Sequence, residues 1–153
     1  MATPLSELLM DLVARWSLLG PVRPGAQEAA LRAFERRRQV VLPEDVTAYF
    51  RVVDGMEAGS GDEELFRFLP LDEMVPITDV FTGGAGAFED RFIFVDYCIS
   101  AHFYAIDLGS GPGRGRVTAV FDLATSYPIA PTFTSFIEAY LHSRDLLFGA
   151  PTG

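Results

Sequence analysis

Lysine is absent from this sequence, and cysteine and histidine are scarce. All 12 basic residues are arginines, so the chain has neither the lysine of a phosphate-binding P-loop nor a lysine that forms a Schiff base. Cys98 is the single cysteine, so no disulfide forms within the chain. One cysteine and two histidines, His102 and His142, are too few for a four-ligand zinc site of Cys and His. These absences exclude several classes of catalytic and structural site.

Long apolar runs are also missing. No stretch approaches the roughly 18 consecutive apolar residues that a membrane-spanning helix needs. The start of the chain, MATPLSELLMDLVARW, carries Glu7 and Asp11 and lacks the basic residues and unbroken apolar centre of a signal peptide. A lone cysteine is typical of a reducing compartment. We therefore expect a cytoplasmic protein that does not bind a membrane.

The charge is mostly of one sign. With 21 acidic and 12 basic residues the formal net charge is −9. A nucleic-acid partner is not expected, because phosphate contacts need clustered cations. Residues 54–79 hold eight of the acids and a single base, Arg67. A negative field of this kind speeds the encounter with a basic protein partner.

The residues that are present suit one folded domain over residues 1–153. Hydrophobic residues make up 49% of the chain and charged residues 22%, which is typical of a globular protein. A chain of this length buries about 70% of the surface that its unfolded form exposes. A disulfide or a metal ion is therefore not needed to hold the fold.

Three helices are predicted in the first third of the chain. Apolar residues recur at helical spacing over residues 5–16, with Thr3 as the expected N-cap. A second helix is predicted over residues 27–38 and a third over residues 43–53. Gly55 then suits a left-handed turn after the third helix.

The pattern changes near residue 65 to aromatic and β-branched runs. Such runs predict four strands, over residues 65–70, 91–97, 99–108 and 117–122. The glycine-rich residues 109–116 are predicted to form a hairpin loop, and residues 83–90 another loop. A last helix follows Thr132, which is one candidate N-cap beside Ser135. We predict an α+β fold: a mostly antiparallel sheet of about four to six strands, with N-terminal helices and a C-terminal helix packed against it.

Several short motifs occur in an order that matches a known family. They are Phe34-Glu35, Leu42-Pro43-Glu44-Asp45, Asp54-Gly55, LFRFLPLDEM (65–74), FIFVDYCISAHFYAIDL (92–108) and IAPTFTSFIEAYL (129–141). In this order and spacing the sequence resembles the SUKH superfamily, and within it the Smi/Knr-type branch, named after yeast regulators of cell-wall glucan synthesis. The resemblance covers roughly residues 25–145. The helix within residues 1–20 lies outside the family signature.

The resemblance implies a protein that acts by binding and not as an enzyme. Bacterial proteins similar to this one are mostly immunity proteins, which bind and neutralise polymorphic toxins encoded beside them. The yeast relatives are regulatory interaction proteins. Neither role has a known catalytic residue or cofactor, so none is carried over. The expected partner is a toxin domain with a basic surface, and the alternative is a regulator or scaffold of the yeast type.

The acidic segment supplies the candidate binding residues. If the segment faces the partner, its exposed carboxylates contribute to the interface, and the candidates are Glu57, Asp62, Glu63, Glu64, Asp72 and Glu73. The alternative is a solvated acidic loop without a partner. A homodimer formed through a sheet edge or the first helix is a further alternative.

Three other features of the sequence bear on whether the chain has a phosphate site, a catalytic site or a reactive thiol. The loop 109–116 has four glycines and two arginines, but it joins two strands and does not open a helix, so a hairpin is favoured over a phosphate site. A small hydrolase using His102 with Ser100, Asp96 or Asp107 is the remaining enzymatic alternative. Cys98 is expected to be a buried apolar side chain.

Overall fold

The chain forms helices first, then a sheet, then a closing helix. The computed structural model describes residues 3–81 and 90–148. In these residues the helices are α1 (Leu5–Ser17), α2 (Glu28–Arg38), α3 (Glu44–Val52), η1 (Leu71–Glu73), α4 (Ile77–Val80), α5 (Phe133–His142) and η3 (Arg144–Phe148). The strands are β1 (Phe66–Phe68), β2 (Val75–Pro76), β3 (Arg91–Tyr97), β4 (His102–Asp107), β5 (Val117–Val120) and β6 (Ser126–Ala130). The predicted α+β fold is confirmed.

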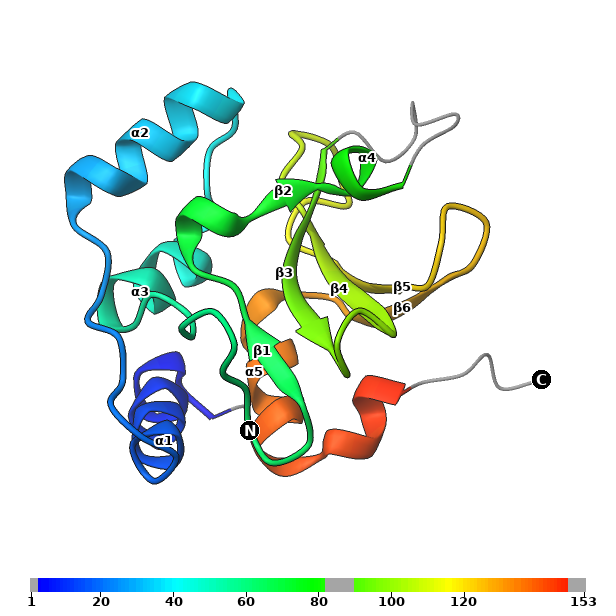
Figure 1. The fold of residues 1–153 in the computed structure, drawn as a ribbon. Coiled ribbons are helices and arrows are strands. Elements are labelled where there is room, and N and C mark those ends of the chain that lie inside the picture. Colours follow the sequence, from blue (N-terminus) through cyan, green and yellow to red (C-terminus); the bar gives the residue numbers. More distant parts are fainter. Residues whose placement is uncertain (1–2, 82–89, 149–153) are drawn as a thin grey trace.

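The sheet of the described chain has six strands, and its paired strands are antiparallel. Its main path runs β1-β3-β4-β5-β6, and β2 pairs with β3 farther along the edge that β1 occupies. In Figure 1, α1, α2 and α3 lie together on one side of the sheet and α5 lies behind β1. The 109–116 segment joins the antiparallel pair β4 and β5, which confirms the predicted hairpin.

Two apolar clusters lie on the two faces of the sheet. The larger one fills the space between the sheet and helices α1, α2, α3 and α5, and it is rich in rings: Trp16, Phe34, Tyr49, Phe50, Phe66, Phe68, Phe92, Phe94, Tyr104, Phe133, Phe136 and Tyr140. The smaller one packs Ile77 of α4 against Ile93, Ala105 and Val120 on the opposite face. Alternation along the strands separates the two sets: in β4, Tyr104 and Ile106 point to the first cluster and Ala105 to the second.

Helix α1 lies outside the predicted family signature but belongs to the larger cluster. Its stripe Leu8, Leu9, Leu12 and Trp16 is buried. The Trp16 indole N–H donates a hydrogen bond of 3.2 Å to the Tyr140 hydroxyl in α5. The first helix therefore shares its core with the sheet and the last helix.

Several predicted boundaries need correction. The N-cap of α1 is Pro4 and not Thr3, and no side chain caps this helix. The strand predicted over residues 99–108 begins at His102, because Cys98, Ile99 and Ser100 adopt left-handed backbone angles in the turn before it. These angles end an extended strand.

At the last helix, one of the two proposed caps is correct. Thr132 is the N-cap of α5, and its side chain accepts a hydrogen bond from the Ser135 N–H. Ser135 completes the capping box as its N3 residue, so the alternative cap at Ser135 is wrong. Strands β2 and β6 and helix α4 were not predicted, because each is short or holds a proline. Of the loop predicted over residues 83–90, only Asp90 lies within the described residues.

Within residues 3–81 and 90–148, no helix combines the length and the apolar character that crossing a membrane requires.

Candidate functional site

The first part of the acidic segment (residues 54–79), from Met56 to Asp62, runs along the outer edge of β1. The Met56 N–H donates to the Phe68 carbonyl at 2.7 Å, and the Asp62 N–H donates to the Phe66 carbonyl at 2.9 Å. The other edge of β1 pairs with β3. The segment thus satisfies the strand groups that face away from the sheet, which fixes its own position.

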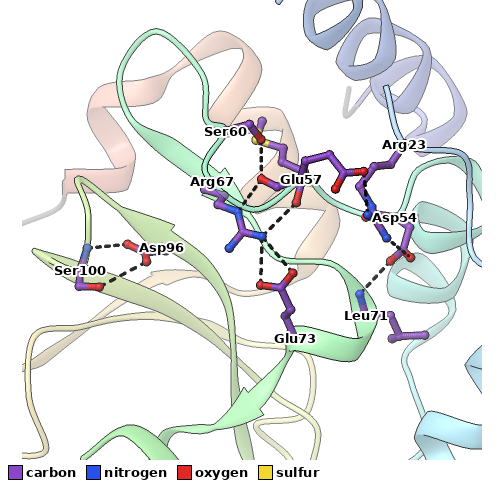
Figure 2. Close-up of polar contacts among 10 residues, drawn as sticks. Arg23, Asp54, Glu57, Ser60, Arg67, Leu71, Glu73, Asp96 and Ser100 are labelled. Atoms are coloured by element: carbon purple, nitrogen blue, oxygen red, sulfur yellow. Dashed lines mark hydrogen bonds and ion pairs between the residues drawn. The ribbon is translucent and has the colours of Figure 1, made fainter. Parts of the chain in front are cut away.

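Asp54 and Gly55 hold the start of the segment. One oxygen of Asp54 accepts the Leu71 N–H at 2.8 Å, and the other accepts Arg23 at 3.3 Å (Figure 2). Gly55 has φ +65°, and a Cβ at this position would lie 2.5 Å from the Leu69 carbonyl carbon. Only glycine allows the two backbones to approach this closely. The Asp-Gly pair therefore joins α3 to the strand region.

Asp62 lies at the other end of the stretch that borders β1. It is the most buried of the predicted binding residues. Its side chain is 6% exposed. One carboxylate oxygen accepts the Glu64 and Phe66 N–H groups at 2.9 and 3.0 Å, and the other accepts the Tyr140 hydroxyl and, at 3.1 Å, Arg144. Burial, followed by the hydrogen bond to Asp62, raises the pKa of Tyr140 far above its ordinary value. The partners of this carboxylate therefore lie within the protein, and its exposed part is too small for a large contact with a partner.

Arg67 and Arg23 organise the middle of the segment. In Figure 2 the Arg67 guanidinium lies between the Glu57 backbone and the Glu73 side chain; it donates to the Glu57 carbonyl at 2.9 Å and to Glu73 at 3.0 Å. Arg23 contacts the Glu57 carboxylate at 2.9 Å. The Glu57 and Glu73 side chains remain well exposed. These two carboxylates are thus positioned by arginines while they still face the solvent.

The remaining candidates lie on the surface. Glu63 and Asp72 are exposed, and neither has an ion pair with another described residue. Glu64 is exposed and pairs with Arg144 at 2.8 Å. Five of the six predicted residues, all except Asp62, therefore form an exposed acidic surface. We call these five residues, Glu57, Glu63, Glu64, Asp72 and Glu73, the acidic surface.

Two arginines in this site were missed at the sequence level. Arg23 precedes the segment, and Arg144 lies 80 residues beyond Glu64, so no local pattern links either of them to it. Arg144 also lies over the Tyr140 ring, 4.1 Å from its centroid. Together they offset part of the segment's charge, because the fold brings to it two positive groups from outside.

His102 lies in a layer of rings and not in an arrangement of catalytic groups. Its ring stacks on Phe121 with centroids 4.5 Å apart and lies 4.8 Å from Tyr97. Its Nε2 is buried and has no hydrogen-bond partner among the described residues. Burial lowers the pKa of His102, although Asp96 opposes this change. Ser100, one of the three groups considered as a partner of His102, donates to Asp96 through its N–H at 2.7 Å and through its hydroxyl at 3.4 Å (Figure 2).

Cys98 and the glycine-rich hairpin have structural surroundings that the sequence did not fully predict. Cys98 is half-buried in the turn, so its predicted full burial is wrong. In the glycine-rich hairpin, Arg114 donates to the Val41 carbonyl at 2.7 Å, which ties the hairpin to the segment before α3. Across the described stretches, no three His, Cys, Asp or Glu side chains are grouped so that they could hold a metal ion.

The family model of the SMI1/KNR4 family (SUKH-1) matches residues 25–139. This chain belongs to that family. The match begins before α2 and ends within α5, so it contains the sheet and the whole acidic segment. No curated protein shows a significant match to the chain.

The geometry gives physical reasons for the motifs that suggested the SUKH-1 family. Leu42 is buried in the larger cluster, and Pro43 precedes α3. Asp54 accepts the Leu71 N–H, and Gly55 allows the close backbone approach described above. These family motifs therefore build the frame that holds the acidic segment against β1.

Proposed function

We propose that this SUKH-1 domain is an immunity protein that binds a toxin domain and blocks its active surface, with the acidic surface as part of the contact. The single observation that carries the proposal is a set of exposed carboxylates mounted on a fixed backbone. Asp54 and Asp62 hold that backbone from inside, and Glu63 and Asp72 face outward. Family membership supports a role in binding.

The electrostatic argument concerns the rate of encounter. A surface of one sign attracts a partner of the opposite sign over about a Debye length, which is roughly 8 Å at physiological salt. Such steering raises association rates, and reversing charges at the rim of an interface mainly lowers them. The partner that fits this surface presents arginine or lysine side chains. A domain that cuts nucleic acid is one such partner, since it must attract phosphates.

The test begins with capture of the partner from the native host by the full-length chain, followed by identification of the bound protein. The captured protein should be toxic when it is expressed alone and harmless when it is co-expressed with this chain. A captured host enzyme whose activity the chain adjusts, with no toxicity, would instead establish the regulatory role of the yeast relatives.

The acidic surface is tested separately by measuring association kinetics with the captured partner. Glu63→Arg combined with Asp72→Arg should slow association about tenfold at low salt and much less at high salt. Asp79→Arg is the control for a single reversal, because Asp79 is exposed in α4 and lies away from the acidic surface. Each single reversal at position 63 or 72 should slow association more than this control. Equal rates for all variants would exclude the acidic surface from the contact.

A further inference from the structure

An exposed apolar patch lies at the end of the sheet where β3 turns into β4. Ile99 at the tip of this turn is 87% exposed. We use "turn patch" for Ile99 and four more exposed large apolar residues at this end of the fold: Leu65 before β1, Phe121 after β5, and Leu146 and Phe148 of η3. In Figure 1, η3 (red) and the chain leading into β1 lie at this end of the molecule.

Backbone and ring contacts connect the parts of the turn patch. The Cys98 N–H donates to the Leu65 carbonyl at 2.9 Å, which joins the turn to the start of β1. The Phe148 ring centroid lies 5.2 Å from that of Tyr97, and Phe121 stacks on His102. The half-buried Tyr97 ring of β3 and the buried His102 ring of β4 therefore pack against the exposed rings.

The backbone of the turn itself is strained. Cys98, Ile99 and Ser100 have φ values of +54°, +53° and +66°, and Leu65 has +71°. Left-handed angles are unfavourable for residues with a Cβ, and most of all for a β-branched residue. Glycine or asparagine suits such positions better. Because its side chain is almost wholly in solvent, Ile99 gains little from the core, and folding alone does not explain an isoleucine here.

The charged residues that border the turn patch are mainly acidic. Glu63 and Glu64 directly precede Leu65, and Asp122 and Asp145 adjoin Phe121 and Leu146 in sequence; all four are exposed. Two nearby arginines are already engaged and mostly buried: Arg67 pairs with Glu73, and Arg144 pairs with Asp62 and Glu64. A third, Arg15, is exposed and lines the same hollow as Glu63 and Glu64. An apolar centre with an acidic border is the common form of an interface with a basic partner.

We infer that the turn patch is the centre of the partner interface, and that it binds a protein segment in which a large apolar residue is flanked by arginine or lysine. This inference rests on the proposed function and adds the chemistry of the partner. Ile99 and its neighbours exclude water around the apolar residue of the partner. Glu63, Glu64 and Asp145 supply the charges that meet its basic groups.

The test uses peptides selected from a random 12-residue display library on the immobilised full-length chain. Enriched peptides should combine arginine or lysine with a large apolar residue. Ile99→Asn should weaken their binding at least tenfold and, at the same time, raise the urea concentration at which half of the protein is unfolded, because asparagine tolerates the left-handed angle. Asp145→Arg should weaken binding at least fivefold. Val41→Asn is the control, since Val41 is 66% exposed and lies before α3; it should leave binding unchanged.

The inference would be overturned if no peptide is enriched, if the enriched peptides are acidic, or if they match the uncharged residues 149–153. It would also be overturned if Ile99→Asn leaves peptide binding unchanged. Self-association of the chain that Ile99→Asn abolishes would show that a second copy is the occupant. Failure of the proposed function is distinguishable. A captured toxin that binds wild type and Ile99→Asn equally overturns the inference alone, while Ile99-dependent basic peptides without any toxic partner overturn the immunity role alone.

Discussion

The carboxylates of the acidic segment divide into an inner and an outer set, although the sequence presents them as one run. Asp54 and Asp62, the inner set, accept backbone N–H groups and arginines and lie mostly inside the protein. Glu63 and Asp72, in the outer set, face the solvent without such partners among the described residues. The most buried of these acids, Asp62, is followed directly by an exposed one, Glu63. The difference shows that charge density along a sequence measures neither exposure nor function.

The inner carboxylates fix the backbone that carries the outer ones. A carboxylate with two backbone donors fixes the peptide groups beside it, so its neighbours keep a constant direction. Asp62 receives the N–H groups of Glu64 and Phe66, and its second oxygen reaches Tyr140 and Arg144 near the end of the described chain. The exposed Glu63 and Glu64 are thus held on a backbone that the core itself stabilises.

The largest contrast is expected between Asp62→Ala and Glu63→Ala. Removing the Asp62 carboxylate leaves Arg144, Tyr140 and two N–H groups without their acceptor, so the free energy of unfolding should fall by about 3–5 kcal/mol. Glu63→Ala should change it by less than about 0.5 kcal/mol. Urea unfolding followed by tryptophan fluorescence measures both changes. The single tryptophan, Trp16, is buried beside Tyr140 and becomes exposed to water when the protein unfolds. Similar losses for the two variants would remove the distinction between inner and outer acids.

A second contrast compares two glycines of the same segment. Gly55→Ala combines an unfavourable φ with a backbone clash against Leu69 and should cost about 2–4 kcal/mol. At Gly59, φ is +79° but a Cβ would meet nothing within 4 Å, so Gly59→Ala should cost only about 1 kcal/mol. Thermal unfolding of both variants checks the order. An equal cost would mean that the close approach at Gly55 relaxes easily.

An alkaline titration sharpens the comparison at Tyr140. Burial raises the pKa values of Tyr49, Tyr104 and Tyr140. The tyrosine hydroxyls of the unfolded chain lose their protons near pH 10, whereas those of the folded chain keep them. The free energy of unfolding is therefore constant in this respect below pH 10 and falls as the pH rises above it. Each tyrosine adds about 1.4 kcal/mol per pH unit to this decline.

Tyr140→Phe should therefore reduce the slope above pH 10 by about 1.4 kcal/mol per pH unit, as urea unfolding at several pH values would show. Its stability at pH 7 should also fall, since Asp62 and Trp16 lose a partner. An unchanged slope would show that the Tyr140 hydroxyl ionises in the folded protein.

The smallest effect is expected at the exposed ion pair between Glu64 and Arg144. Because the Glu64 side chain is well exposed, Glu64→Ala should cost about 0.2–1 kcal/mol, and the cost should shrink in 1 M salt. The control is Glu28→Ala, which removes exposed pairs with Arg32 and Arg51 in a different part of the fold. A loss that salt does not reduce would place Glu64 with the inner set.

Much of the fold was predictable because its elements follow local rules. The apolar stripe of α1, Pro43 before α3 and Thr132 before α5 are signals within a few residues, and the structure has a helix at each. Strand β3 has the predicted bounds, 91–97, since its aromatic and β-branched run is unbroken. Strand β6 was missed because Pro128 stands in its middle, a residue usually kept to sheet edges.

The division of the acids was not predictable, because its cause is not local. Asp62 is buried by Tyr140 and Arg144, which lie about 80 residues away. Likewise, the exposed Ile99 looked like part of a strand, since an isoleucine between aromatic runs fits an extended pattern. Only the fold shows that the turn around Ile99 is left-handed.

The contact between Trp16 and Tyr140 has a practical consequence for work on this family. Neither residue lies within 25–139, the range that the family model matches, and both face the ring cluster around Phe68. A fragment cut at those limits would lack both side chains. The loss would leave a cavity in the core and expose the aromatic rings around Phe68 to water. Truncation at the boundary that homology suggests is thus expected to yield an insoluble product, whereas the unit that folds also includes α1 and the end of α5.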